Sequence, residues 1–329
     1  MSVFELTRQL MAIPSFTEEE GSLAAFLSDL LSTRGYTMTP IAVSERRYNV
    51  VARLDRPVVL LCTHMDTVPP FIPFREDDLF IYGRGACDAK GIIAAMITAG
   101  DVLMSEGIKN FGFLFTVGEE TDSLGARVAG LSDLRADYIV VGEPTENRLA
   151  VSHKGNVMFT LSAAGRAAHS AYPESGESAI DKLLDVLTDL RRADFGTDSL
   201  LGPATLNIGV IAGGVRANVI PDAAEAKVLI RAVTPARQVM EQVITLCQGR
   251  AEVAFVNQVD PQRMVTLPGY ETTRVSFGTD IPYLRSVGQP LLIGPGSILT
   301  AHGPEERVAK QELLRAVELY VALVKDLCR

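Results

Sequence analysis

Several short apolar runs of the sequence are followed closely by side chains that bind metals. They are His64 and Asp66 after residues 58–62, Glu119 and Glu120 after 111–117, Glu143 after 138–141, and His302 beyond 291–293. A further acid, Asp88, precedes an apolar run at 91–103. Two imidazoles with three of these five carboxylates suit Zn²⁺ best, with Co²⁺ or Mn²⁺ as substitutes. The residue types therefore predict a metal centre.

The spacing of these residues suggests different roles for neighbouring acids. Glu119 and Glu120 are adjacent and should point in opposite directions, so one can bind metal while the other faces a metal-bound water as general base. Asp66 lies two residues after His64 and, on an extended segment, would point the same way. We expect its carboxylate to orient the imidazole.

The elements that position these residues alternate along the chain. Residues 50–54, 58–62, 111–117, 138–141 and 291–293 are predicted strands, and residues 91–103 and 311–327 are predicted helices. Residues 1–31 should also be helical, with a turn at Pro14–Ser15. This alternation predicts an α/β fold with a mostly parallel, mixed sheet between helices. Ligands of such sheets bind beyond the carboxyl ends of the strands, where the acids and histidines lie.

The pattern changes after about residue 154. Strands are predicted at 157–163, 205–211, 224–230 and 251–256, and helices at 178–190 and 235–247. The order β-α-β-β-α-β is typical of a small four-stranded α+β unit. We therefore expect a discontinuous catalytic domain, residues 1–154 and 260–329, with an inserted domain at 155–259.

Composition excludes several classes of protein. The net charge of −9 and the pI of about 5.1 argue against nucleic acid as the main partner. No uncharged apolar run reaches the roughly 18 residues of a membrane span. Glu5 and Arg8 interrupt the N-terminal apolar pattern, which favours an amphipathic helix over a signal peptide. The four cysteines form no CxxC pair, as expected for reduced thiols in a cytoplasmic protein.

Competing motifs are incomplete. Gly83-Arg84-Gly85 begins a GxGxxG pattern, but Asp88 stands where the third glycine belongs. The segment around Lys90 lacks P-loop spacing, and the chain has neither HExxH nor GxSxG.

A series of motifs, in order along nearly the whole chain, resembles one family. They are THMDTVP, GRGACDAKG, GEETDSLGA, GEPT, HKG, AAHSAYP and GPGSILTAHGPEE. The sequence resembles the co-catalytic zinc hydrolases that include acetylornithine deacetylase, succinyl-diaminopimelate desuccinylase, aminoacylase-1 and the glutamate carboxypeptidases. The segment IPFREDDLFIYGRGACDAKG is especially similar to the acetyl-lysine and acetylornithine deacetylases.

The resemblance implies a role for each motif residue. The first zinc would be bound by His64 and Glu143, the second by Glu120 and His302, and both by Asp88, with Glu119 as the base and Asp66 as the partner of His64. It also implies a cis peptide bond after Asp88. The implied fold is a catalytic α/β domain with an inserted four-stranded lid that often mediates dimerisation.

Four further residues match positions that bind substrate in the family. His169 would reach the scissile carbonyl across a dimer, Arg231 would pair with a substrate carboxylate, and Asn218 and Ser297 would help to line the pocket. The alternatives are a capping or surface histidine, an arginine at an exposed strand end and a turn asparagine.

The chain departs from the family pattern between residues 259 and 276. This segment is shorter than usual, so we expect an outer helix of the catalytic domain to be missing. Cys87, directly before the bridging aspartate, is either oxidation-sensitive or a filler of space.

These features predict an enzyme of amino-acid biosynthesis that removes an acyl group, most simply acetyl, from an N-acyl amino acid such as N-acetylornithine or N-acetyl-lysine. Glu119 would activate a metal-bridged water. The alternatives are a dipeptidase or carboxypeptidase of the same family, a two-metal phosphatase, and a non-catalytic binding protein. The expected partners are a small substrate and a second copy of the chain, with neither nucleic acid nor membrane.

Overall fold

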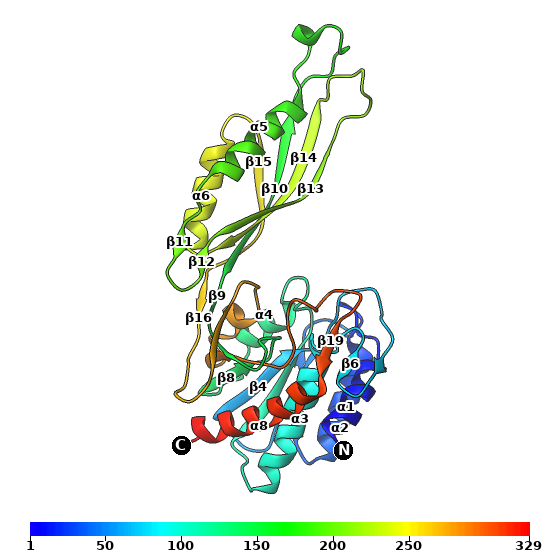
Figure 1. The fold of residues 1–329 in the computed structure, drawn as a ribbon, viewed down its shortest axis with the longest axis vertical. Coiled ribbons are helices and arrows are strands. Elements are labelled where there is room, and N and C mark those ends of the chain that lie inside the picture. The colour runs from blue at the N-terminus through cyan, green and yellow to red at the C-terminus, as the bar shows by residue number, and fades with distance from the viewer. The chain divides into compact units, whose positions relative to one another are not determined.

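The computed structural model describes residues 1–329, which divide into two compact units (Figure 1). Unit 1 comprises residues 1–151, 264–273 and 279–329, and unit 2 comprises residues 152–263 and 274–278. The structure therefore groups 152–154, 260–263 and 274–278 with the inserted part of the chain, next to residues they contact there. Arg274, for example, donates a hydrogen bond to the carbonyl oxygen of Leu200.

Unit 1 is built on a seven-stranded sheet. The strand order is β1 (Thr37–Met38), β3 (Tyr48–Arg53), β7 (Phe111–Thr116), β4 (Val59–His64), β8 (Tyr138–Val141) and β18 (Gln289–Leu292), with β2 (Ile41–Ala42) also paired to β3. Strands β7, β4, β8 and β18 are parallel, whereas β3 and its neighbours β1 and β2 are antiparallel. The predicted mixed, mostly parallel sheet is confirmed.

Helices cover both faces of this sheet. They are α1 (Val3–Met11), α2 (Gly21–Thr33), α3 (Lys90–Ser105), α4 (Leu124–Leu131), α7 (Ile281–Leu284) and α8 (Lys310–Leu327). Apolar residues of α1, α2, α3 and α8 form one buried cluster with Phe111, Phe113 and Phe115 of β7. Helices α4 and α7 contact each other, and α4 also contacts β3. The strands are buried on both sides, which explains their continuous apolar sequences.

Smaller elements complete unit 1 and lead to unit 2. A three-stranded sheet contains β19 (Arg307–Ala309), β6 (Phe80–Tyr82) and β5 (Arg75–Glu76). The chain passes between the units at β9 (Leu149–His153), β16 (Gln262–Arg263) and β17 (Thr272–Val275). No helix lies between Val259 and Ile281, in agreement with the predicted loss of an outer helix.

Unit 2 is a four-stranded antiparallel sheet with two helices on one face (Figure 1). Its elements are β10 (Gly155–Ala164), η1 (Pro173–Ser175), α5 (Ala179–Arg192), β11 (Thr197–Asp198), β12 (Gly202–Pro203), β13 (Thr205–Gly213), β14 (Ala223–Ala232), α6 (Ala236–Cys247) and β15 (Glu252–Val259). Val157, Phe159 and Leu161 of β10 alternate with more exposed residues and pack against α5 and α6. This is the predicted β-α-β-β-α-β order, with β13 and β15 at the edges.

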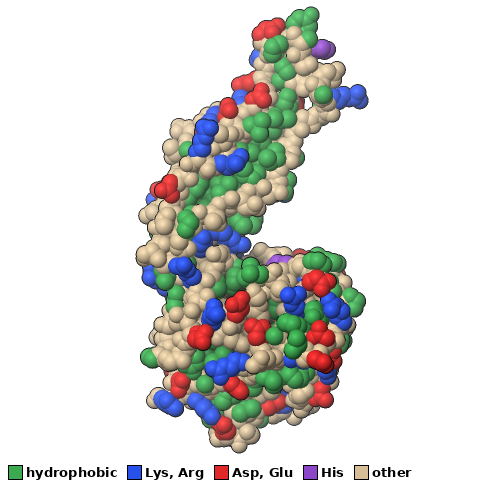
Figure 2. Space-filling model, in the orientation of Figure 1, with side chains coloured by type: hydrophobic (Ala, Val, Ile, Leu, Met, Phe, Trp, Pro, Cys, Tyr) green, Lys and Arg blue, Asp and Glu red, His purple; other side chains and the backbone are tan.

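Surface and interior features agree with the composition. Acidic and basic side chains are interspersed on the face shown in Figure 2. No helix combines the length and the apolar character needed to cross a membrane. All four cysteines are free thiols.

Candidate metal centre

The parallel strands of unit 1 bring the predicted metal ligands to one edge of the sheet. Strand β4 ends at His64, β7 leads into Glu119 and Glu120, β8 leads into Glu143, and β18 leads towards the segment with His302. Because these four strands are parallel neighbours, their carboxyl ends lie together.

Two groups of three ligands share one aspartate. The ligand atoms of the first group, His64, Asp88 and Glu143, lie within 4.8 Å of one another, and so do those of the second, Asp88, Glu120 and His302. Asp88 Oδ1 lies 2.9 Å from His64 Nε2, and Asp88 Oδ2 lies 3.2 Å from His302 Nε2. The two carboxylate oxygens of Asp88 therefore face different groups, as expected of a bridging ligand. The Asp88–Ala89 peptide bond is cis, as the resemblance implies.

Burial and charge set unusual pKa values in this cluster. Burial, with Glu143 nearby, raises the pKa of Glu119 well above that of an ordinary glutamate, and burial raises those of Glu120 and Glu143 too. Hydrogen bonds to Asp88 and Glu120 raise the pKa of His302 to about 10. Several carboxylates packed together out of water are costly unless cations neutralise them. The donor set of two imidazoles and three carboxylates fits divalent metal ions.

Asp66 contacts both His64 and the turn that carries the two glutamates. His64 Nδ1 lies 3.0 Å from the backbone carbonyl oxygen of Asp66 and 3.6 Å from its carboxylate. The carboxylate also accepts hydrogen bonds from the backbone N–H groups of Glu119 and Glu120, both at 3.1 Å, and from the Thr17 hydroxyl at 2.8 Å. Asp66 thus links His64 to the turn that carries both glutamates.

The three candidates from the inserted segment lie in unit 2 and form no part of the ligand groups. His169 and Asn218 are exposed neighbours: His169 bridges to Val219, and the backbone N–H of Ser170 donates to the carbonyl of Asn218. Arg231 lies near the C-terminal end of β14, opposite Asn156 of β10 and Thr205 of β13.

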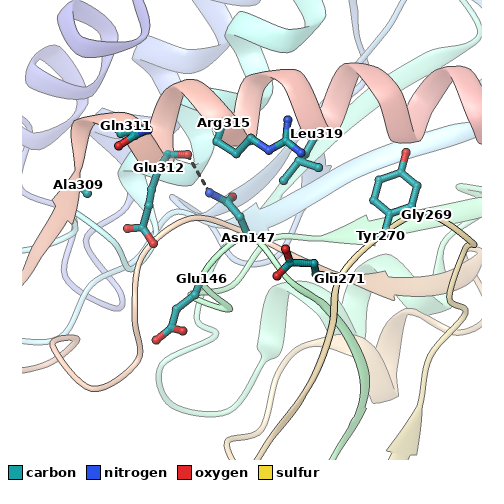
Figure 3. Close-up of a pocket in the computed structure, with 10 residues that line it drawn as sticks. All are labelled: Glu146, Asn147, Gly269, Tyr270, Glu271, Ala309, Gln311, Glu312, Arg315 and Leu319. Carbon is teal, nitrogen blue, oxygen red and sulfur yellow. Dashed lines mark hydrogen bonds between the residues drawn. The ribbon is translucent and has the colours of Figure 1, made fainter.

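Ser297 lies in unit 1, where it contacts a residue that lines a pocket away from the metal ligands. Its hydroxyl donates a 3.0 Å hydrogen bond to Glu146. Glu146 lines a cavity of about 460 Å³ beside α8, where Asn147 Nδ2 donates to the carbonyl oxygen of Glu312 (Figure 3). The lining residues are Glu146, Asn147, Gly269, Tyr270, Glu271, Ala309, Gln311, Glu312, Arg315 and Leu319. None of the predicted metal ligands is among them, so this pocket is distinct from the metal centre.

Sequence reasoning missed a buried carboxylate near the cluster. Asp280 is 3% exposed, its Oδ2 accepts a 2.8 Å hydrogen bond from the Thr116 hydroxyl, and burial raises its pKa to about 6. It is close enough to Glu119 and Glu143 to contribute to their raised pKa values. The sequence signal for Asp280 is the short motif Gly278-Thr279-Asp280. It was missed because the motif lies directly before α7, whereas the other candidate acids were sought after apolar strands.

Comparison with known proteins identifies the family. The profile of peptidase family M20/M25/M40 matches residues 60–326. A peptidase M20 domain-containing protein of Schizosaccharomyces pombe is 39% identical over 339 residues, covering 98% of this chain and 84% of the relative. A protein of Aspergillus clavatus named "probable carboxypeptidase" is 35% identical over 360 residues, covering 97% of this chain and 87% of the relative.

A solved structure agrees in fold. The tripeptidase of Staphylococcus aureus superposes with a TM-score of 0.85 at 22% identity, covering 99% of this chain and 97% of the other. The match of the profile to most of the chain and the identity to curated relatives lead to the same assignment. The chain belongs to peptidase family M20/M25/M40 and is a hydrolase that acts on carbon–nitrogen bonds.

Proposed function

We propose that this protein is a two-zinc peptidase that cleaves the amide bond next to the free carboxylate of a small peptide. The observation that carries the proposal is the pair of ligand groups that share Asp88, with the half-buried Glu119 beside them. The sequence motifs favoured deacetylation of an N-acyl amino acid. The carboxypeptidase name of a relative at 35% identity favours the alternative, a carboxypeptidase or dipeptidase, which we now place first.

In this proposal His64 and Glu143 would hold one ion, Glu120 and His302 would hold the other, and Asp88 would contribute to both sites. Zn²⁺ suits this ligand set best, and Co²⁺ or Mn²⁺ would substitute. When bound, the two metal ions would supply Lewis acidity for the scissile carbonyl and for water. Asp66 holds the turn of Glu119 through its backbone N–H.

The chain's own proton transfers are assigned to one residue. Glu119, ionised, accepts the proton of the attacking water and then delivers it to the nitrogen of the leaving amine. Desolvation and the nearby Glu143 raise the pKa of the Glu119 carboxylate above that of an ordinary glutamate, which makes its ionised form a stronger base.

Substrate contacts are proposed from the matched motifs. Arg231 would bind the substrate carboxylate through two parallel hydrogen bonds, and His169 would donate to the oxygen that becomes negative as the carbonyl is attacked. Asn218 and Ser297 would help to hold the substrate. The same motifs support the roles of residues 155–259 as a lid and of the remainder as the catalytic domain.

We also propose that unit 2 carries a homodimer contact. Strand β13 is an edge strand, and Val210, Ile211 and Val215 at and beyond its end are 48%, 55% and 82% exposed. Exposed edges with apolar side chains are prone to pair with another chain. A second copy of the same edge would cover them.

A substrate panel tests the proposed reaction. The zinc-loaded protein would be assayed with dipeptides, tripeptides and N-acetyl amino acids, each with a free and an amidated C-terminus, and Glu119→Gln would be the inactive control. We expect peptides to be cleaved fastest, with amidation slowing cleavage about 10- to 100-fold as the charge-assisted hydrogen bonds to Arg231 are lost. Faster turnover of N-acetyl amino acids would assign the deacetylase instead. If the metal-loaded protein hydrolysed only phosphate esters, or none of these substrates, both the peptidase and the deacetylase would be rejected.

A further inference from the structure

A buried ion pair lies beside the metal centre without belonging to either ligand group. Arg84 is 3% exposed and Glu306 is 1% exposed, and Arg84 Nη1 lies 2.5 Å from Glu306 Oε2. A buried ion pair often contributes little net stability, because both charges lose their hydration. Its other contacts therefore matter more for understanding what it does.

Glu306 contacts the backbone of the bridging aspartate. Its Oε1 atom accepts hydrogen bonds from the backbone N–H groups of Asp88, at 3.3 Å, and Cys87, at 3.4 Å. The carbonyl oxygen of Glu306 also accepts a 2.9 Å hydrogen bond from the N–H of Gly83. The segment that precedes α3 is thus fixed to the segment that follows His302.

Arg84 contacts the second metal-binding segment. Its Nη2 atom donates a 3.4 Å hydrogen bond to the backbone carbonyl oxygen of His302. His302 has a φ of 61°, in the left-handed region that residues other than glycine rarely adopt. Such a conformation persists only where surrounding contacts hold it in place. The Arg84 hydrogen bond is one such contact.

We propose that Arg84 and Glu306 are positioning residues for the second metal ion, the one held by Asp88, Glu120 and His302. The pair fixes the backbone of two of these three ligands, which come from segments far apart in the sequence. Of the ligands of the first ion, the Arg84–Glu306 pair contacts only Asp88, which both groups share. This inference rests on the proposed two-metal centre, and it assigns the two residues a selective effect on one half of it.

The neighbouring Glu305 provides a matched control. It has the same charge and lies one residue away, but it is exposed and pairs with the exposed Arg75. Glu305→Gln therefore removes a carboxylate from the same segment without touching Asp88 or His302. A general effect of charge near the site would appear in this variant as well.

The experiment is a calorimetric Zn²⁺ titration of the metal-stripped full-length chain, repeated with Co²⁺ while its absorption bands are recorded. For Glu306→Gln we expect the second ion to bind about 10- to 100-fold more weakly, with a smaller change for the first ion, whose group loses support only at the shared Asp88. Glu305→Gln should match the wild type. Arg84→Lys, which keeps the charge but loses the N–H directed at His302, should also weaken the second ion.

Glu306→Gln leaves the Arg84 charge buried and unpaired, which threatens folding. The double variant Arg84→Met/Glu306→Gln removes both charges and carries the test if the single variant fails to fold. Two ions bound at wild-type affinity in the folded double variant and in Arg84→Lys would overturn the inference. Equal weakening of both ions would also overturn it. A wild-type chain that binds fewer than two ions would instead reject the two-metal centre itself.

Discussion

Both units are built from helices and strands, but they place their candidate functional residues differently. In unit 1 the parallel strands β4, β7, β8 and β18 end at one edge, and both ligand groups are assembled there. In unit 2 the strands are antiparallel, so their carboxyl ends alternate between the two ends of the sheet. The candidates there lie in two separate places: His169 and Asn218 are neighbours before β14, and Arg231 lies near the C-terminal end of that strand. A parallel sheet concentrates residues for chemistry, whereas this antiparallel one presents them separately.

The largest effect on activity is expected when the proposed base in unit 1, Glu119, is replaced. Glu119→Gln should lower kcat by about 100- to 10,000-fold, the usual contribution of a general base, because the amide cannot accept the proton of water. Metal content should stay unchanged, since Glu119 belongs to neither ligand group. Steady-state kinetics with metal analysis would check both. Near-normal kcat with full metal content would show that another group is the base.

Substitutions in the two apolar cores should have the same effect on stability but different effects on Zn²⁺ binding. Phe113 of unit 1 and Phe159 of unit 2 are fully buried in different apolar clusters. Replacing either with Ala should lower the free energy of unfolding by about 3–5 kcal/mol. Only Phe113→Ala should also weaken Zn²⁺ binding, because β7 leads into Glu119 and Glu120. Denaturant unfolding and zinc titration would measure the two effects. A loss of zinc affinity in Phe159→Ala would argue against this difference.

A smaller effect is expected for the exposed histidine of unit 2. His169→Ala should lower kcat/KM by about 100- to 1,000-fold, the cost of losing one donor to a developing oxyanion, with unchanged affinity for both ions. The neighbouring Tyr172→Phe, which keeps an aromatic ring beside His169, is the matched control. Wild-type kcat/KM in His169→Ala would leave this residue as part of the surface only.

The smallest predicted effect is a pH dependence confined to unit 1. In the metal-free protein, hydrogen bonds to Asp88 and Glu120 raise the pKa of His302 to about 10. Zn²⁺ must displace that proton, so below this pKa the affinity for the second ion rises with pH, by about tenfold per pH unit for each proton displaced. Zinc titrations in buffers of different pH would measure the slope. His302→Ala should reduce it, and His169→Ala should leave it unchanged.

The sequence predicted the parts of the structure that follow from local pattern. Continuous apolar runs identified the buried strands, and the residues after them identified four candidate ligands: His64, Glu120, Glu143 and His302. The bridging role of Asp88 and the division into two groups came from the family resemblance of the motifs. The sequence could not predict that the Asp66 carboxylate would contact the backbone of Glu119 and Glu120, because that contact depends on how two strand ends approach each other. It also could not separate Glu305 from Glu306, since identical adjacent residues differ only in burial.

The number of metal ions bound per chain tests the central claim most directly. Elemental analysis of the zinc-loaded protein after removal of free metal should give about two ions for the wild type, one for each ligand group. His302→Ala should retain about one, because His64, Asp88 and Glu143 remain. Two ions in His302→Ala, or one or none in the wild type, would contradict the account.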